Sequence, residues 1–125
     1  MTGNYTANLA LYIDGNWRSG DGRDVHQVLN PATGEVLAEL PLATAADLDE
    51  ALAASAKGFA LWRATDVNAR AVVLHKTAAL IRERAEHIAT LLTMEQGKPL
   101  AEARTETLSC AAVFEYCAEE AKRSY

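Results

Sequence analysis

The stretch Thr93–Ala103, TMEQGKPLAEA, decides the fold because it joins the end of one helix to the start of another. Gly97 can adopt the left-handed conformation that closes a helix. Pro99 lacks an N–H group that the first turn of a helix would leave unpaired in any case. The sequence therefore predicts one helix that stops at Gly97 and a second helix that starts at Pro99.

Apolar residues on both sides of this junction have the spacing of helices. Downstream they predict a single buried stripe, made of Leu100, Ala103, Thr107, Cys110, Phe114, Cys117 and Ala121. Upstream, the apolar residues of Val67–Gln96 stay nearly in phase without an intervening Gly or Pro, which by itself predicts one long helix. A further helix is predicted at Ala45–Trp62, where Thr44 and Asp47 resemble a capping box.

The first forty residues read as short strands and turns. The predicted strand segments are Leu11–Ile13, Trp17–Arg18, Val25–Leu29 and Glu35–Leu40. Turns at Asp14–Asn16 and Asn30–Gly34 join them, with Gly and Pro where the backbone must reverse. We therefore predict two hairpins within residues 11–41 and about four helices within 44–125, which makes the isolated chain α+β and mostly helical.

Composition excludes several classes of protein. The chain has 125 residues, half of them hydrophobic, and a formal net charge of −5. Its apolar runs are far shorter than the roughly 20 residues of a membrane span. Its basic residues are spread among acids and form no run suited to phosphate backbones. We expect a globular protein that binds neither nucleic acid nor a membrane.

The N-terminus and the cysteines both favour a cytoplasmic location. Residues 1–10 have no basic segment followed by a long apolar one, so we predict a flexible terminus and not a secretory signal. Cys110 and Cys117 lie seven positions apart in a predicted helix, roughly 10 Å along its axis. A disulfide requires Cα atoms within roughly 7 Å, so these thiols are not expected to pair.

We find no sequence motif for catalysis or for cofactor binding in these 125 residues. Gly20-x-Gly22 lacks a third glycine and a following helix, so a turn is favoured over a phosphate-binding loop. Cys110 has no basic neighbour in sequence to promote its thiolate, which favours a packing role over a nucleophilic one. The three histidines have no metal-binding spacing. We assign no catalytic and no cofactor-binding residue.

The amino-acid sequences of three segments carry a resemblance to a known family. TMEQGKPLAEA at 93–103, NPATGE at 30–35 and EEAKRSY at 119–125 together resemble the N-terminal part of NAD(P)-dependent aldehyde dehydrogenases, most closely the succinate-semialdehyde branch. The resemblance implies the N-terminal part of a multi-domain α/β enzyme that forms homo-oligomers and uses NAD or NADP. It also implies a short break near Arg84–Glu86 in the long predicted helix, and we adopt that break.

The same resemblance suggests two groups of site residues. The main-chain oxygen of Val28 and the carboxylate of Glu95 correspond to positions that can hold a monovalent cation, although Glu95 could instead form a salt bridge. Ser109, Val113 and Phe114 correspond to a helix that flanks the substrate tunnel. The family's cysteine nucleophile and cofactor-binding groups correspond to positions beyond Tyr125.

Two functions fit these observations. In the first, residues 11–125 are the N-terminal scaffold of an enzyme that oxidises an aldehyde such as succinate semialdehyde, with the remainder of that enzyme as its partner. This chain alone is then inactive and binds no cofactor. In the second, the chain is a truncated, non-catalytic product or a helical module that binds a protein through its apolar stripe.

Overall fold

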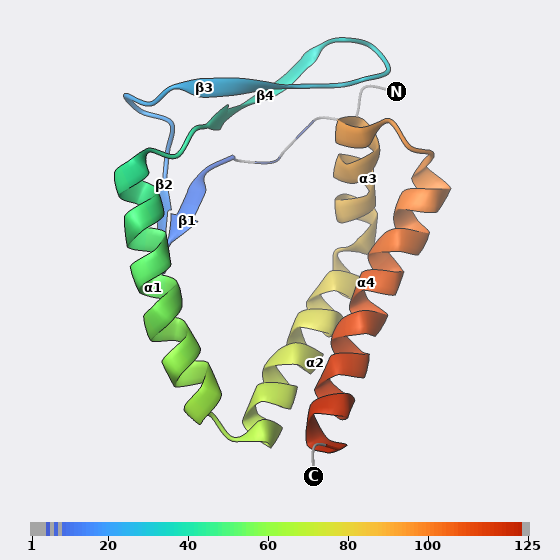
Figure 1. Ribbon diagram of the computed structural model, residues 1–125. Helices are drawn as coiled ribbons and strands as arrows, with labels where there is room; N and C mark the ends of the chain where they lie inside the picture. Colours follow the sequence, from blue (N-terminus) through green and yellow to red (C-terminus); the bar gives the residue numbers. More distant parts are fainter. Residues whose placement is uncertain (1–4, 6, 8, 124–125) are drawn as a thin grey trace. The chain divides into compact units, whose positions relative to one another are not determined.

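A computed structural model describes residues 5, 7 and 9–123. Much of the predicted flexible terminus, residues 1–10, therefore lies outside the described residues. The chain divides into two compact units, Met1–Arg63 and Ala64–Tyr125. In the described residues, unit 1 contains two antiparallel hairpins and one helix, and unit 2 contains three helices and a short 3-10 turn (Figure 1). The predicted α+β, mostly helical class is confirmed.

The first hairpin of unit 1 pairs β1 (Leu11–Ile13) with β2 (Asn16–Arg18). Its two-residue loop, Asp14–Gly15, has φ angles of 48° and 81°. Two positive φ angles define the type I′ turn, whose twist matches that of paired strands. Tyr12 faces Trp17 across the hairpin with ring centroids 4.7 Å apart, and Ile13 is buried.

The second hairpin pairs β3 (Val25–Leu29) with β4 (Val36–Pro41). The register shifts between Val28 and Leu29, which leaves one extra residue, Leu37, on β4. In the connecting turn, the side-chain oxygen of Asn30 accepts a hydrogen bond from the Ala32 N–H, and Gly34 has a φ of 75°. The predicted Asn-Pro-Ala-Thr-Gly turn is therefore present.

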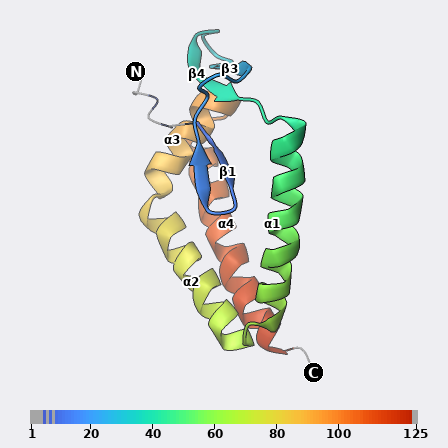
Figure 2. The same cartoon turned by 90° about the vertical axis from the view of Figure 1, so that its left-hand side faces the viewer.

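Helix α1 (Ala45–Ala64) completes unit 1. Its N-terminus has the predicted reciprocal cap, because the Thr44 hydroxyl accepts from the Asp47 N–H and the Asp47 carboxylate accepts from the Thr44 N–H. Its apolar stripe, however, stays uncovered in this chain, where Leu48, Leu52 and Phe59 are all more than half exposed. The hairpins and α1 can be followed from a second side in Figure 2.

Unit 2 is built from α2 (Val67–Glu83), α3 (Ala85–Gln96), α4 (Leu100–Glu120) and the turn η1 (Ala121–Arg123). Asp66 caps α2 by accepting from the N–H groups of Asn68 and Ala69. The helix breaks at Arg84, which confirms the predicted interruption. Both α2 and α3 run beside α4 (Figure 1).

The junction that decides the fold has the predicted form, with one small shift. Gly97 is left-handed, with a φ of 76°, and its N–H donates to the Thr93 carbonyl at 2.8 Å. Pro99 precedes the first helical residue, Leu100, and is not itself helical, because its ψ of 140° is extended. Its carbonyl accepts the first two hydrogen bonds of α4, from Glu102 and Ala103.

The core of unit 2 consists of small side chains. Its buried residues are Ala71, Ala78, Ala89, Ala103, Thr107, Ala111 and Ala118. Alanine lets helix axes approach closely, which explains how α4 lies against both α2 and α3. The predicted stripe on α4 was partly wrong, because Ala111 and Ala118 are buried where Cys110 and Cys117 were expected. Both series repeat every three or four residues, so only the position of the neighbouring helices selects between them.

Candidate functional site

Helix α4 positions the three residues predicted to line a substrate tunnel. Ser109 is exposed, Val113 is 59% exposed, and Phe114 is half-buried. Residues four apart share one face of a helix, so Ser109 and Val113 form a common surface. Phe114 instead lies on the side of buried Ala111 and Ala118. The helix brings two of the three residues together on its open face, and their role in a tunnel stays a prediction.

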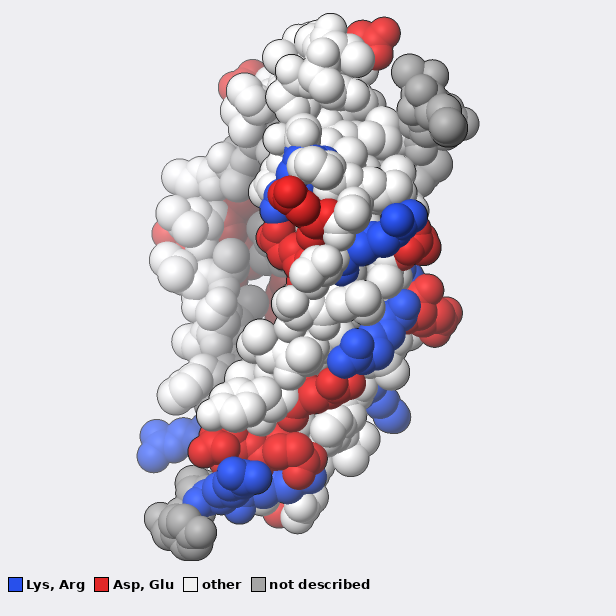
Figure 3. Space-filling view, turned by 90° about the vertical axis from the view of Figure 1, so that its right-hand side faces the viewer, with Lys and Arg blue, Asp and Glu red and all other residues white. Residues whose placement is uncertain are grey.

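Exposed ion pairs to the neighbouring helices border the opposite, packed side of α4. Arg82 on α2 contacts Glu115 at 2.7 Å, and Arg104 makes a bidentate contact with Glu86 on α3 through Nε and Nη2, each at 2.7 Å. These arginines lower the pKa of Glu115 and of Glu86. Acidic and basic side chains accordingly lie next to one another on the face shown in Figure 3. Because these pairs are exposed, they stabilise the contacts of α4 only weakly.

Both cysteines are unpaired thiols on exposed positions of α4. Cys110 borders a groove of about 220 Å³ within unit 2 that is lined by Ile81, Ile88, Leu92, Glu106, Thr107 and Cys110. These lining residues include an acid but no histidine, lysine or arginine, so they supply no group that would promote a thiolate. The predicted packing role of Cys110 is not fulfilled within this chain, since the thiol borders an open groove.

The residues predicted to hold a monovalent cation lie in different units. Val28 belongs to β3 of unit 1, paired with Ala38 at the bulge, and Glu95 belongs to the last turn of α3 in unit 2. The cation site therefore stays a prediction. Among the described residues, no group of three or more His, Cys, Asp and Glu side chains is placed to bind a metal ion.

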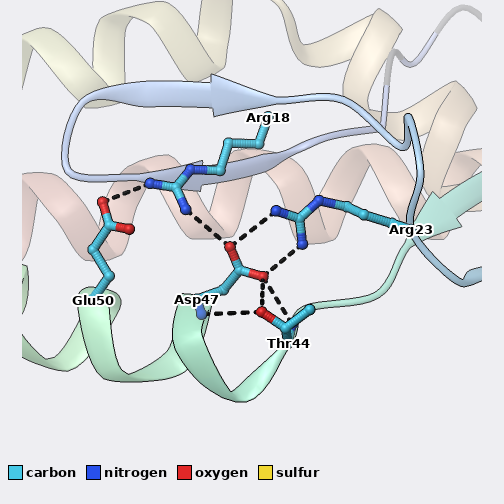
Figure 4. A network of polar contacts seen from close by, with 5 residues as sticks. All are labelled: Arg18, Arg23, Thr44, Asp47 and Glu50. Carbon is cyan, nitrogen blue, oxygen red and sulfur yellow. Dashed lines mark hydrogen bonds and ion pairs between the residues drawn. The ribbon is translucent and has the colours of Figure 1, made fainter.

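A polar cluster around Asp47 is the feature that sequence reasoning missed. Asp47 is only 3% exposed, and its carboxylate accepts from Arg23 at 2.5 and 3.0 Å and from Arg18 at 2.9 Å (Figure 4). Arg18 also contacts Glu50 at 2.5 Å. The hydrogen bonds from Arg23, Thr44 and Arg18 lower the pKa of Asp47 well below its ordinary range. The cluster therefore holds an ionised carboxylate out of solvent.

The cluster joins three parts of unit 1 through one carboxylate. Arg18 comes from β2, Arg23 from the loop before β3, and Asp47 from the first turn of α1. The predicted capping box accounts for the contacts between Thr44 and Asp47, which are close in sequence. The arginines lie 29 and 24 positions away along the sequence, and no local pattern indicates a contact at that distance. Both carboxylate oxygens of Asp47 accept hydrogen bonds within the cluster. The cluster therefore connects structural elements and leaves neither oxygen free to bind a ligand.

The glycine pair considered as a nucleotide loop forms a turn. Gly22 has a φ of 72°, and the Arg23 N–H donates to the Gly20 carbonyl at 3.0 Å. A strand follows this turn, whereas a dinucleotide phosphate needs the N-terminus of a helix. These residues do not fit a nicotinamide cofactor.

No helix in the described part of the chain is long and apolar enough to cross a membrane.

Several curated proteins with similar sequences are named as dehydrogenases. The chain is 47% identical over 115 residues to 4-(hydroxymethyl)benzenesulfonate dehydrogenase of Comamonas testosteroni, covering 92% of this chain and 24% of that protein. It is 41% identical over 114 residues to glutarate-semialdehyde dehydrogenase of Pseudomonas putida, covering 91% and 24%. The chain thus spans about a quarter of the length of the curated relatives it matches.

Solved structures also match nearly the whole of this chain with about a quarter of their own length. Succinate-semialdehyde dehydrogenase from Burkholderia pseudomallei matches with a TM-score of 0.88 and 38% identity, over 94% of this chain and 24% of its own. An NADP-dependent enzyme of E. coli matches at 0.89 and 37%, over 98% and 25%. The NAD-dependent benzaldehyde dehydrogenase from Corynebacterium glutamicum matches at 0.87 and 28%, over 94% and 26%.

A family model agrees with these individual matches and covers most of the chain. The model is described as the aldehyde dehydrogenase family, and it matches residues 17–125. The matched region begins within β2 and includes the second hairpin, the helices α1 to α4 and the Gly97–Pro99 junction. On this evidence the chain belongs to the aldehyde dehydrogenase family.

Proposed function

We propose that residues 11–125 form the N-terminal scaffold segment of an enzyme that oxidises an aldehyde to a carboxylic acid with NAD or NADP. The observation that carries this proposal is the family match over residues 17–125 together with a span of only 24% of the relatives' length. The groups for cysteine attack, hydride transfer and cofactor binding then belong to the remainder of the enzyme. This chain alone is inactive and binds no cofactor.

The substrate we propose is an aldehyde with an anionic group at its far end, succinate semialdehyde first. The similar proteins include ones named for a benzenesulfonate, for glutarate semialdehyde and for succinate semialdehyde. Each of these names denotes a compound with a sulfonate or carboxylate. Ser109, Val113 and Phe114 carry no positive charge, so the anionic end would be bound by residues of the remainder of the enzyme.

The uncovered apolar surface supports a segment over a self-sufficient module. No large side chain is fully buried in the described part of the chain, while Trp17, Phe59 and Leu61 are exposed by 65% or more. Monomeric proteins rarely leave large contiguous apolar patches exposed. In our proposal the remainder of a soluble, cytoplasmic homo-oligomeric enzyme covers these residues. Helix α4 then offers Ser109 and Val113 to the substrate entrance.

We also propose that the Val28 carbonyl oxygen and the Glu95 carboxylate bind a monovalent cation in the intact enzyme. Both are oxygen ligands of the kind that hard cations prefer. The test is a sodium or potassium titration of the purified intact enzyme, monitored by thermal unfolding. Glu95→Gln should abolish the cation-dependent rise in melting temperature, whereas Glu102→Gln on α4 should retain it. An equal rise in both variants would remove Glu95 from the site.

The first experiment measures the mass of the natural product. Peptides of this chain should be recovered from a denaturing gel band several times heavier than 13.5 kDa. That enzyme should reduce NAD or NADP with succinate semialdehyde, and more slowly with benzaldehyde, which lacks an anionic group. Recovery only near the mass of this chain would refute catalysis. A faster reaction with benzaldehyde would refute the anionic substrate and leave the enzyme class intact.

The competing function is a non-catalytic interaction module, which would bind a partner protein through the same exposed apolar residues. An evolved module should unfold in one sharp transition, whereas an isolated segment should unfold with poor cooperativity or self-associate. Thermal unfolding of the 125-residue chain, followed by circular dichroism and light scattering, separates the two. A single sharp transition of a monomer would favour the module and count against the scaffold.

A further inference from the structure

We draw no further inference here: the strongest candidate, the apolar groove that Ile81, Ile88, Leu92 and Cys110 line between α2, α3 and α4, carries nothing because no feature of the structure shows what covers it.

Discussion

Each of the two units is stabilised internally by a different kind of contact. Among the described residues of unit 1, those that are buried are Ile13, Pro41 and Asp47. The Asp47 carboxylate accepts hydrogen bonds from Arg18 of the first hairpin, from Arg23 of the loop before β3 and from its own helix cap. In unit 2 the buried residues are alanines and one threonine along three packed helices. Unit 1 is thus organised by the polar cluster around Asp47, and unit 2 is organised by close packing of its helices.

This difference indicates which unit depends more on a single residue. A carboxylate with two arginine partners is a sensitive position, because removing its charge weakens the hydrogen bonds of both arginines at once. A row of alanines distributes the contact over many positions, each of which contributes little. The ion pairs of unit 2 are exposed, and exposed pairs stabilise weakly. Unit 1 should therefore be sensitive to one substitution and unit 2 to a change of side-chain volume.

The largest effect is expected for Asp47→Asn. The amide keeps the size of the side chain but loses the charge that Arg18 and Arg23 share, so unit 1 should loosen. Hydrogen exchange measured by mass spectrometry should show faster exchange in peptides covering residues 11–29 and unchanged exchange in 100–120. Asp49→Asn, an exposed position on the same helix, is the control. Equal exchange in both variants would contradict the role of the cluster.

Next in size is the acid response of unit 1. The pKa of Asp47 is lower in the folded chain than in the unfolded one, so the unfolded state binds the proton first as the pH falls. The stabilisation by Asp47 is present at neutral pH and is lost as the pH drops below about 4. Both tryptophans, Trp17 and Trp62, lie in unit 1, so tryptophan fluorescence should report this loss. Asp47→Asn should flatten the response.

The close contact in unit 2 is tested by adding volume. Ala111→Leu places a large side chain on a position with no exposed surface, and overpacking costs about 1–3 kcal/mol. Ala112→Leu changes the next residue, which is exposed, and should leave the stability within about 0.5 kcal/mol. Hydrogen exchange in peptides covering residues 100–120 measures the local free energy of opening in both variants without requiring one cooperative transition. A cost for Ala112→Leu as large as that for Ala111→Leu would place the packed face of α4 elsewhere.

The smallest effects come from two glycines in opposite environments. Gly97→Ala puts a Cβ on a left-handed residue and should destabilise unit 2 by about 1–2 kcal/mol. Gly58→Ala lies within α1, where a Cβ meets no atom within 4 Å, and should stabilise that helix by about 0.5–1 kcal/mol. The rate of hydrogen exchange should therefore shift in opposite directions, rising in unit 2 for Gly97→Ala and falling in α1 for Gly58→Ala. Shifts of the same sign would show that one glycine has another role.

The elements of the fold follow from local signals, and the contacts between them do not. Asp14–Gly15, Asn30–Gly34 and Gly97–Pro99 each specify a turn through backbone preferences that need no distant partner, so these turns were predicted. The break at Arg84 has no Gly or Pro to mark it, and it was adopted only because of the family resemblance. For the candidate site, α4 was predicted, but which of its residues face outward depends on where α2 and α3 lie.

The sequence by itself determined the order of hairpins and helices, the boundaries set by glycine and proline, and the family. Tertiary structure alone decided two things. It selected Ala111 and Ala118 over Cys110 and Cys117 as the packed face of α4, because both sets satisfy the helical repeat and only a neighbouring helix distinguishes them. It also brought Arg18 and Arg23 to Asp47, because long-range ion pairs leave no periodic trace along a chain.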